Sequence, residues 1–251
     1  CIRDSFKGIR ISTRPDAVDG EICDILEKYH VTAVELGAQS TNDKVLAMNR
    51  RGHTREDIFR SARLLKDRGF ELGLQMMTGL YGSNDEDSIG TARDIISLSP
   101  DTARIYPTVV IENTELAELY RNGEYRPQTP EEAAVLCAKI LPLFERAGIK
   151  VIRLGLHSGG DVEGSFVAGA YHPALREMCE GHIYFDIINR ALSGKEKGKY
   201  IIYVAPREVS KASGQRRCNI EKLRELGYEC RIKENAALSA RDITLEKVNL
   251  L

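Results

Sequence analysis

Short β-branched segments alternate with amphipathic helical segments over residues 8–156, and this alternation restricts the fold more than any other feature of the sequence. The predicted strands are 8–13, 32–36, 70–77, 102–106 and 150–156. Predicted helices lie between them, and two have clear N-caps, Thr54 with Asp57 three residues later and Thr129 followed by Pro130. Strands joined by helices through short links favour a parallel sheet, and we therefore predict an α/β fold of the barrel or doubly wound kind.

Polar residues recur where the predicted strands end. Alternation along a strand places Glu35, Gly37 and Gln39 on one face of the second strand. Three other strands end in similar pairs on one face, Ser12 with Arg14, Arg104 with Tyr106, and Arg153 with His157, and a fourth carries Gln75 alone. Polar groups at the carboxyl ends of parallel strands line the mouth of a barrel, which makes a barrel our preferred interpretation. A single residue of this kind is more readily explained as a solvated strand end.

The composition limits the classes of partner. The chain has 251 residues, is 42% hydrophobic and has a net charge of −1, so any attraction to nucleic acid must come from a local patch. No apolar run approaches the roughly 18 residues of a membrane span, and no signal peptide is recognised at the N-terminus. We therefore predict a cytoplasmic protein that does not bind membranes.

The cysteines and histidines do not form a metal site by spacing. Neither C-x-x-C nor H-x-x-x-H occurs in the sequence. We expect most cysteines to be reduced packing residues. The six cysteines are Cys1, Cys23, Cys137, Cys179, Cys218 and Cys230.

The last fifty residues have a separate pattern. A strand at 200–204, a helical turn at 208–212, a loop at 214–217, a helix at 218–226 and a strand at 228–233 follow one another. This order resembles the KH core, whose G-x-x-G loop holds single-stranded nucleic acid, although Arg217 replaces the second glycine. A plain αβ appendage is the alternative. Four cations surround the loop and are the predicted RNA contacts: Arg207, Lys211, Arg216 and Arg217.

Six blocks, in order, resemble one known family: RISTRPD (10–16), VELGAQS (34–40), NRRGHT (49–54), GLQMMTGL (73–80), ARIYPTVV (103–110) and HPALRE (172–177). They resemble the radical S-adenosylmethionine proteins related to the catalytic subunit of Elongator, and in particular the bacterial relatives without the acetyltransferase half. The resemblance covers nearly the whole chain. It departs from the family at Asn49, Tyr81 and the pair His157-Ser158.

The resemblance implies a partial TIM-type (β/α)6 radical SAM barrel, truncated at the N-terminus, with a small C-terminal αβ appendage. The implied division is 1–198 for the barrel and the helices after it, and 199–251 for the KH-like unit. The family binds a [4Fe–4S] cluster through a C-x-x-x-C-x-x-C loop after its first strand, and that motif does not occur here. We therefore expect a fragment that cannot hold the cluster itself. The strand at 8–13, without its upstream neighbours, would be a sheet edge able to pair with another chain.

The resemblance also assigns S-adenosylmethionine contacts by position. Arg51 corresponds to the partner of the methionine carboxylate, and Gln39 and Gln75 correspond to ribose contacts. Ser12 and Thr13 correspond to the methionine end, and Met77 and Tyr106 to the flanks of adenine. Amides can both donate to and accept from ribose hydroxyls, and arginine offers a fixed fork to a carboxylate.

Three functions remain open from the sequence. The first is a radical S-adenosylmethionine enzyme that makes a 5′-deoxyadenosyl radical and acts on tRNA. The second is a non-catalytic scaffold that binds the cofactor or RNA. The third is an ordinary barrel lyase or isomerase, for which only Glu35 and His157 offer a general base at a strand end. No catalytic residue is assigned.

Overall fold

A five-stranded parallel sheet forms the centre of the larger of two compact units, in a computed structural model that describes residues 8–156 and 164–248. Contacts divide the chain into Cys1–Pro173 and Ala174–Leu251. The strands of the large sheet, in spatial order, are β1 (Ile9–Thr13), β2 (Val31–Gln39), β3 (Glu71–Thr78), β4 (Thr102–Pro107) and β6 (Lys150–Leu154). All four pairings are parallel, and β1 and β6 are the edges of the described sheet.

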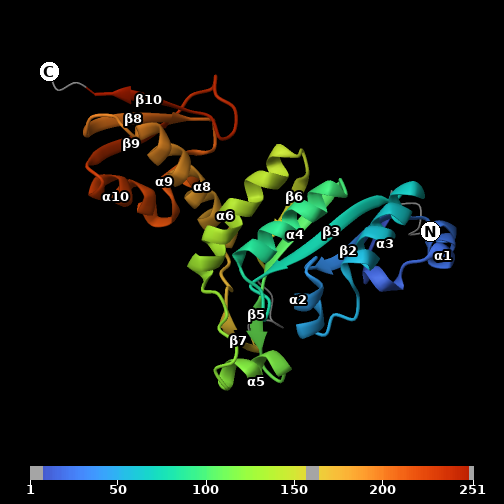
Figure 1. Cartoon of the computed structure of the whole chain (residues 1–251). Helices are drawn as coiled ribbons and strands as arrows, with labels where there is room; N and C mark the ends of the chain where they lie inside the picture. The colour runs from blue at the N-terminus through green and yellow to red at the C-terminus, as the bar shows by residue number, and fades with distance from the viewer. Residues whose placement is uncertain (1–7, 157–163, 249–251) are drawn as a thin grey trace. The chain divides into compact units, whose positions relative to one another are not determined.

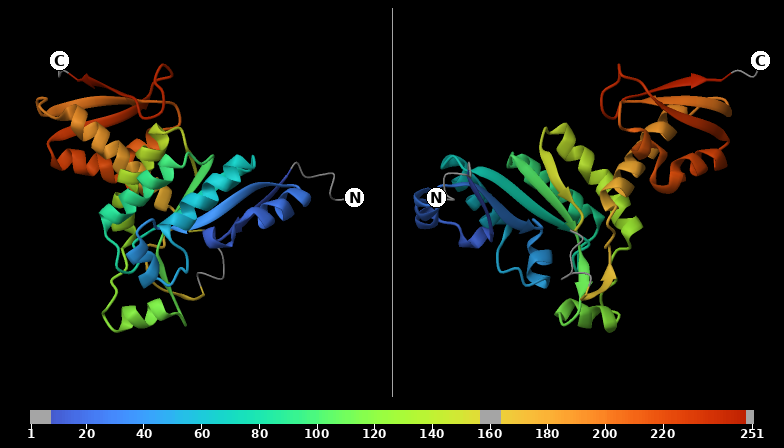
Figure 2. Two further views of the ribbon diagram at one scale, coloured as in Figure 1. Left: turned by 45° about the vertical axis from the view of Figure 1, so that its right-hand side comes forward. Right: turned by 180° about the vertical axis from the view of Figure 1, so that it is seen from behind.

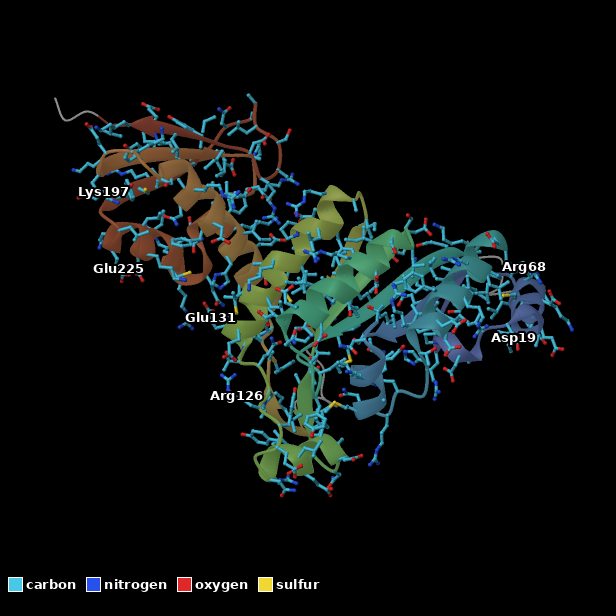
Figure 3. The ribbon with its side chains drawn as sticks, viewed as in Figure 1. Asp19, Arg68, Arg126, Glu131, Lys197 and Glu225 are labelled. Atoms are coloured by element: carbon cyan, nitrogen blue, oxygen red, sulfur yellow. The ribbon has the colours of Figure 1, made fainter. Side chains whose placement is uncertain are left out.

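Helices cover one face of this sheet, as Figures 1 and 2 show. They are α1 (Gly20–Lys28), α3 (Arg55–Asp67), α4 (Asp85–Ser97) and α6 (Pro130–Arg146), with the short α2 (Asp43–Met48) after β2. Alternate strand residues such as Val34, Leu74 and Ile105 are fully buried beneath the helices. The residues between them point to the opposite face, which we call the inner face. On the outside, Arg68 (Figure 3) pairs with Asp24 of α1 at 2.8 Å.

The helix starts follow the local sequence. Thr54 accepts from the backbone N–H of Asp57, whose carboxylate accepts from the backbone N–H of Thr54. The same reciprocal pair joins Thr129 to Glu132 at the start of α6. These boxes satisfy two of the free N–H groups at each helix start, and both predicted N-caps are confirmed.

The second strand is longer than the sequence predicted. β2 continues through Gly37 and Ala38 to Gln39, and a bulge lies between Gly37 and Gln39. Gln39 has φ 63°, a left-handed conformation that turns the chain sharply into the next segment. The strand therefore ends at Gln39 and not at residue 36.

A small antiparallel ribbon extends the larger unit. β5 (Val109–Ile111) pairs with β7 (Phe166–Gly169), and α5 (Glu115–Arg121) packs beside them. Gly169 has φ 116°, and a Cβ there would lie 3.0 Å from the carbonyl oxygen of Thr108. The sequence did not reveal these two strands, because segments of three and four residues are too short to show alternation.

The smaller unit has three strands and three helices in its described part. Its elements are α8 (Leu175–Leu192), β8 (Gly198–Val204), α9 (Val209–Ser213), α10 (Cys218–Glu225), β9 (Tyr228–Glu234) and β10 (Ile243–Lys247). The sheet order is β10-β8-β9, with β8 and β9 parallel and β10 antiparallel to β8. Tyr184 and Ile188 of α8 are fully buried in one cluster with Ile202 and Leu223.

The boundary of the smaller unit differs from the one expected at 198/199. The structure divides the chain before α8 because α8 packs into the core of the three-stranded sheet. The predicted β-α-loop-α-β order is present, and β10 is a strand that the sequence did not reveal. No helix in the described residues is long and apolar enough to cross a membrane.

Candidate functional site

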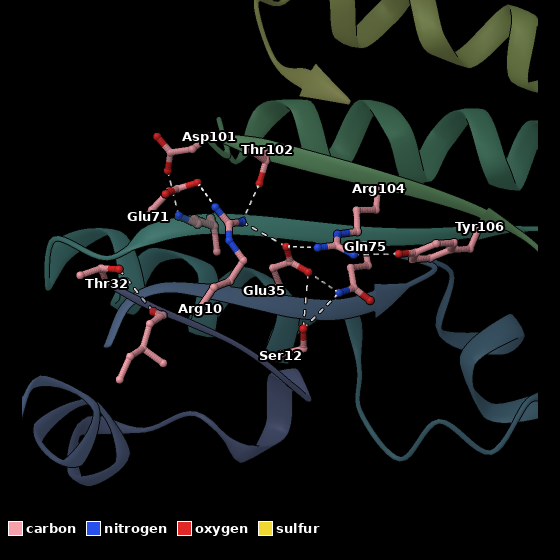
Figure 4. Close-up of polar contacts among 12 residues, drawn as sticks. Arg10, Ser12, Thr32, Glu35, Glu71, Gln75, Asp101, Thr102, Arg104 and Tyr106 are labelled. Carbon is pink, nitrogen blue, oxygen red and sulfur yellow. Dashed lines mark hydrogen bonds and ion pairs between the residues drawn. The ribbon is translucent and has the colours of Figure 1, made fainter. Parts of the chain in front are cut away.

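A buried carboxylate organises the inner face of the large sheet (Figure 4). The side chain of Glu35 on β2 is only 2% exposed. Its Oε1 accepts from Arg10 Nη1 at 3.0 Å and from Arg104 Nη2 at 2.8 Å. Its Oε2 accepts from Gln75 Nε2 at 2.7 Å and from Ser12 Oγ at 3.4 Å. We call these five residues, which come from all of β1 to β4, the Glu35 centre.

A glycine on the neighbouring strand makes room for this carboxylate. Gly73 of β3 lies directly opposite Glu35 in the strand register. A Cβ at Gly73 would lie 2.6 Å from Glu35 Cγ and 3.2 Å from Thr102 Oγ1. Any larger residue at this position would displace Glu35 from its donors, so the Glu35 centre requires a glycine at position 73.

The surroundings keep Glu35 ionised. Burial raises the pKa of its carboxyl, but hydrogen bonds from Gln75, Arg10 and Arg104 outweigh burial and hold the pKa below its usual value. A carboxylate held by two guanidinium groups is a poor proton acceptor, so the geometry does not favour Glu35 as the general base of a lyase. The other candidate base, His157, lies outside the described residues.

The turn after α2 fixes Arg51 next to the strand ends. The backbone N–H of Arg51 donates to Leu46 O at 3.0 Å, which closes the helix. Gly52 has φ 75°, and a Cβ there would lie 2.8 Å from Arg14 Nη2. His53 is 6% exposed, and its Nε2 lies 3.1 Å from Ala38 O at the end of β2. The basic turn is therefore attached to the strand that ends in Gln39.

The guanidinium of Arg51 has no counter-ion in the described part of the chain. Its Nη2 contacts Met77 Sδ at 3.3 Å, and its Nε is buried without a hydrogen-bond partner. Burial alone lowers the pKa of this group. The neighbouring Arg50 differs, because its side chain is 77% exposed and pairs with Glu115 at 2.8 Å. Burying part of a cation without a partner costs free energy, so an anion bound beside Arg51 would be stabilised.

The predicted cofactor residues fall into adjoining groups on the inner face and at its strand ends. Ser12 and Gln75 are joined through Glu35, and Arg51 contacts Met77. Met77 and Tyr106 are register partners on β3 and β4, and Tyr106 Oη accepts from Arg104 Nη1 at 3.1 Å.

The remaining two predicted residues meet at Gly37. A Cβ on Gly37 would lie 2.8 Å from Gln39 Nε2 and 3.8 Å from Thr13 O. The side chain of Gln39 therefore folds back over the glycine beside the end of β1. That these seven residues hold a cofactor stays a prediction.

The sequence did not identify the Glu35 centre as a unit. It placed Glu35 and Arg104 on polar strand faces, but the contact between them depends on the register of three strands. Arg10 was missed as a participant because it lies before the strand end. The sequence offered one signal, Gly73, because a glycine inside a predicted strand often marks a place where another group approaches the backbone closely.

The donor set fits the polar groups of S-adenosylmethionine. A carboxylate would supply the anion that Arg51 lacks, and Gln75, whose Nε2 is committed to Glu35, keeps Oε1 for a hydroxyl donor. The described residues do not fit a [4Fe–4S] cluster in the same way. They contain no group of three or more His, Cys, Asp or Glu side chains that could hold a metal ion.

The cations predicted to bind RNA are only partly available. Lys211 lies 2.8 Å from Glu180 Oε2 and 2.7 Å from Glu208 Oε1. Tyr184 Oη donates to Glu208, so these four residues form an internal network that we call the Lys211 centre. Lys211 is therefore held in internal ion pairs, and its assignment as an RNA contact stays a prediction.

Comparison with known proteins gives two family matches. The Radical SAM superfamily profile matches residues 1–95, and the Radical_SAM C-terminal domain profile matches residues 100–184. Together they span most of the larger unit and the start of the smaller one.

Curated relatives and one solved structure agree with these matches. The tRNA uridine(34) acetyltransferase of Methanocaldococcus jannaschii is 39% identical over 142 residues, 54% of this chain and 26% of that protein. Elongator complex protein 3 of Homo sapiens is 36% identical over 146 residues, 54% of this chain and 25% of that protein. The chain thus spans about a quarter of the length of these relatives. The structure of Methanocaldococcus infernus Elp3 with an N-terminal deletion matches with a TM-score of 0.61 and 28% identity, over 71% of this chain and 46% of that one.

Proposed function

The chain belongs to the radical SAM superfamily and is homologous to Elongator complex protein 3, and we propose that its inner sheet face binds S-adenosylmethionine for radical chemistry on tRNA. The α/β fold with a parallel sheet is that of the superfamily, as the sequence predicted. The observation that carries the proposal is the half-buried guanidinium of Arg51, whose Nε is buried without a hydrogen-bond partner, which lacks a counter-ion in the described residues, and which adjoins the polar strand ends.

The proposed contacts are those that the resemblance assigns by position, and some of them match a donor or acceptor on this face. Arg51 binds the methionine carboxylate through its fork of N–H groups. Gln75 accepts from a ribose hydroxyl through Oε1, and Gln39 is the second ribose contact. Ser12 and Thr13 lie at the methionine end. Met77 and Tyr106, which are register partners, flank the adenine.

The Glu35 centre has a positioning role in this proposal. Glu35 holds the amide of Gln75 through Nε2, which fixes the direction of Oε1. It also pairs with Arg10 and Arg104, whereas Arg51 has no counter-ion in the described residues and is available to a carboxylate. These roles concern binding and orientation, and none depends on the cluster.

The cluster is the part of the chemistry for which the described residues offer no ligands. In this superfamily a [4Fe–4S] cluster supplies the electron that cleaves the sulfonium. We propose that this chain alone binds the cofactor and leaves it intact. A non-catalytic scaffold shares the same cofactor site, and anaerobic reconstitution with iron and sulfide separates it from an active enzyme. Stoichiometric absorbance near ~400 nm, as thiolate-bound clusters give, would contradict the expectation that this chain binds no cluster.

The substrate class rests on the relatives. One is named as a tRNA uridine(34) acetyltransferase, and we propose a tRNA as the substrate of the protein that contains this chain. We also propose that the protein is cytoplasmic. We further propose that the smaller unit contacts the RNA.

Two neighbouring arginines provide the test. We expect Arg51→Ala to weaken S-adenosylmethionine binding by about 1.5–3 kcal/mol, the range for a hydrogen bond to a charged group. Arg50→Ala removes the same charge one residue earlier, from an exposed side chain paired with Glu115, and should leave binding unchanged. Isothermal titration calorimetry measures both. Equal affinities for wild type and Arg51→Ala would remove Arg51 from the site.

A further inference from the structure

A basic groove lies on the smaller unit, away from the Lys211 centre. Its volume is about 510 Å³, and residues of β8, α10 and β9 line it. Four of its lining residues are cations, Lys199, Arg217, Arg224 and Arg231, and one is a carboxylate, Glu229. Four positive charges and one negative charge leave a net charge of +3 at this groove, on a chain whose net charge is −1.

The arginines of the groove are not used by the fold. Lys199 Nζ lies 3.6 Å from Glu229 Oε2, so these two partly neutralise each other. Within the described residues, the side chains of Arg217, Arg224 and Arg231 make no ion pair or hydrogen bond, and all three are exposed. This contrasts with Lys211, which two carboxylates hold. The groove therefore presents three available guanidinium groups.

The groove has an apolar component between its charges. Ile220 and Arg224 are four residues apart, which places them along one side of α10, and Arg217, with φ 65°, is the N-cap of that helix. Ile201 of β8 also lines the groove. Guanidinium groups around apolar side chains suit a ligand with a charged backbone and flat, weakly polar groups.

The loop that leads into α10 is held in one conformation. Gly214 has φ 73°, and a Cβ there would lie 2.7 Å from Cys218 Sγ. Asn219 is 1% exposed, and its Nδ2 donates to Gly181 O at 2.8 Å and to Ala212 O at 3.0 Å. These contacts attach the start of α10 to α8 and α9. Arg217 is consequently placed at one end of the groove by a rigid support.

We infer that this groove binds a single strand of RNA, with the three arginines on phosphates and the apolar residues against bases. The inference rests on the proposed function, because it specifies the partner as RNA. Sequence-tolerant binding of single strands commonly combines a cationic groove with surfaces on which bases pack. A membrane would be bound by an amphipathic surface helix rather than a recess. An acidic peptide is the remaining competitor and is one outcome of the test.

The experiment is a fluorescence anisotropy titration of the whole chain with a labelled single-stranded RNA at several salt concentrations. The groove variant is Arg224→Gln/Arg231→Gln. The control is Arg190→Gln/Lys195→Gln, which removes the same charge from exposed positions of the same unit outside this groove. The groove variant should bind about a hundredfold more weakly, because it loses two charged contacts of roughly tenfold each, the lower end for charged hydrogen bonds. Its slope of log affinity against log salt should be shallower by about 1.4, since each phosphate contact contributes about 0.7. The control should match wild type.

Other outcomes overturn the inference. Equal losses in the groove and control variants would mean that only total charge matters. Tighter binding of a polyglutamate peptide, or of a duplex of the same RNA, would assign the groove to another partner. Arg51→Ala separates the two proposals, because it should weaken cofactor binding while leaving RNA affinity unchanged. If the groove variant keeps wild-type RNA affinity and binds the cofactor normally, the RNA groove is rejected and the proposed cofactor site is not affected.

Discussion

The Glu35 centre and the Lys211 centre are ion networks, one in each unit of the chain. The central group of the first is an anion, and that of the second is a cation. In the first, a carboxylate accepts from two arginines, a glutamine and a serine. In the second, an ammonium is held by two carboxylates, one of which also accepts from Tyr184. Both networks join elements that are distant in the sequence.

The two centres differ in what surrounds them. The Glu35 centre includes Ser12 and Gln75, which have remaining hydrogen-bonding capacity toward a ligand, and lies on the same sheet as Arg51. The Lys211 centre joins α8 to α9, and its one cation is paired with two carboxylates. A charged cluster that orients groups toward open space is a candidate for binding, whereas one that satisfies itself is a structural contact. The charges available to a partner in the smaller unit are the arginines of the groove.

The largest expected effect comes from removing the carboxylate of the first centre. Glu35→Ala leaves Arg10 and Arg104, whose side chains are 36% and 30% exposed, without their shared partner, and we expect a loss of about 1.5–3 kcal/mol, the range for hydrogen bonds to charged groups. Urea unfolding followed by circular dichroism measures the change in unfolding free energy. Glu71→Ala is the control, because Glu71 pairs with the same Arg10 from a side chain that is 42% exposed. A comparable loss in the control would mean that the burial of Glu35 is not what matters.

Removing the cation of the second centre should cost less. Lys211→Met leaves Glu180 and Glu208 near each other, but the Lys211 side chain is 33% exposed, so water screens part of the effect. We expect a loss of about 1–2 kcal/mol in unfolding free energy. Lys199→Met, whose partner Glu229 is 65% exposed, should change stability little. Stability equal to wild type in Lys211→Met would contradict a structural role for Lys211.

Both centres should lose stability in acid. The pKa of Glu208 is raised by burial, but hydrogen bonds from Lys211 and Tyr184 outweigh this and lower it, as for Glu35. A carboxyl whose pKa is lower in the folded state stabilises fully above its unfolded pKa, near 4.5, and loses this contribution as the pH falls through the folded value. Glu35→Gln should reduce the acid slope of unfolding free energy by at most about 1.4 kcal/mol per pH unit, the limit for one proton. An unchanged slope would show that the pKa of Glu35 is not lower in the folded protein than in the unfolded one.

The smallest expected effect distinguishes a binding centre from a structural one. Gln75→Leu removes one neutral hydrogen bond to the ribose and should weaken S-adenosylmethionine binding by about 0.5–1.5 kcal/mol. Calorimetry on the folded variant measures it, with Asn122→Leu on the outside of the larger unit as control. Unchanged affinity would leave Ser12 and Gln75 as packing residues of the Glu35 centre.

Local features of this chain were readable from the sequence, and features that depend on register were not. The caps at Thr54 and Thr129 lie within three residues of their partners, so the sequence predicted them. The contact between Glu35 and Arg104 joins strands β2 and β4 across Gly73, and its existence depends on which residues face each other. The ion pair between Lys211 and Glu180 could not be predicted for the same reason, because Glu180 lies on α8, far away in the sequence. Strands β5, β7 and β10 are short and were missed.

The central claim is that Arg51 binds the carboxylate of S-adenosylmethionine. It is tested most directly by comparing S-adenosylmethionine with its decarboxylated analogue on wild type and on Arg51→Ala. We predict that wild type prefers the intact cofactor by at least about tenfold, the lower end for a charged hydrogen bond, and that Arg51→Ala binds both ligands equally. If Arg51→Ala discriminates between the two ligands as well as wild type does, the carboxylate is bound elsewhere and the account of this site is wrong.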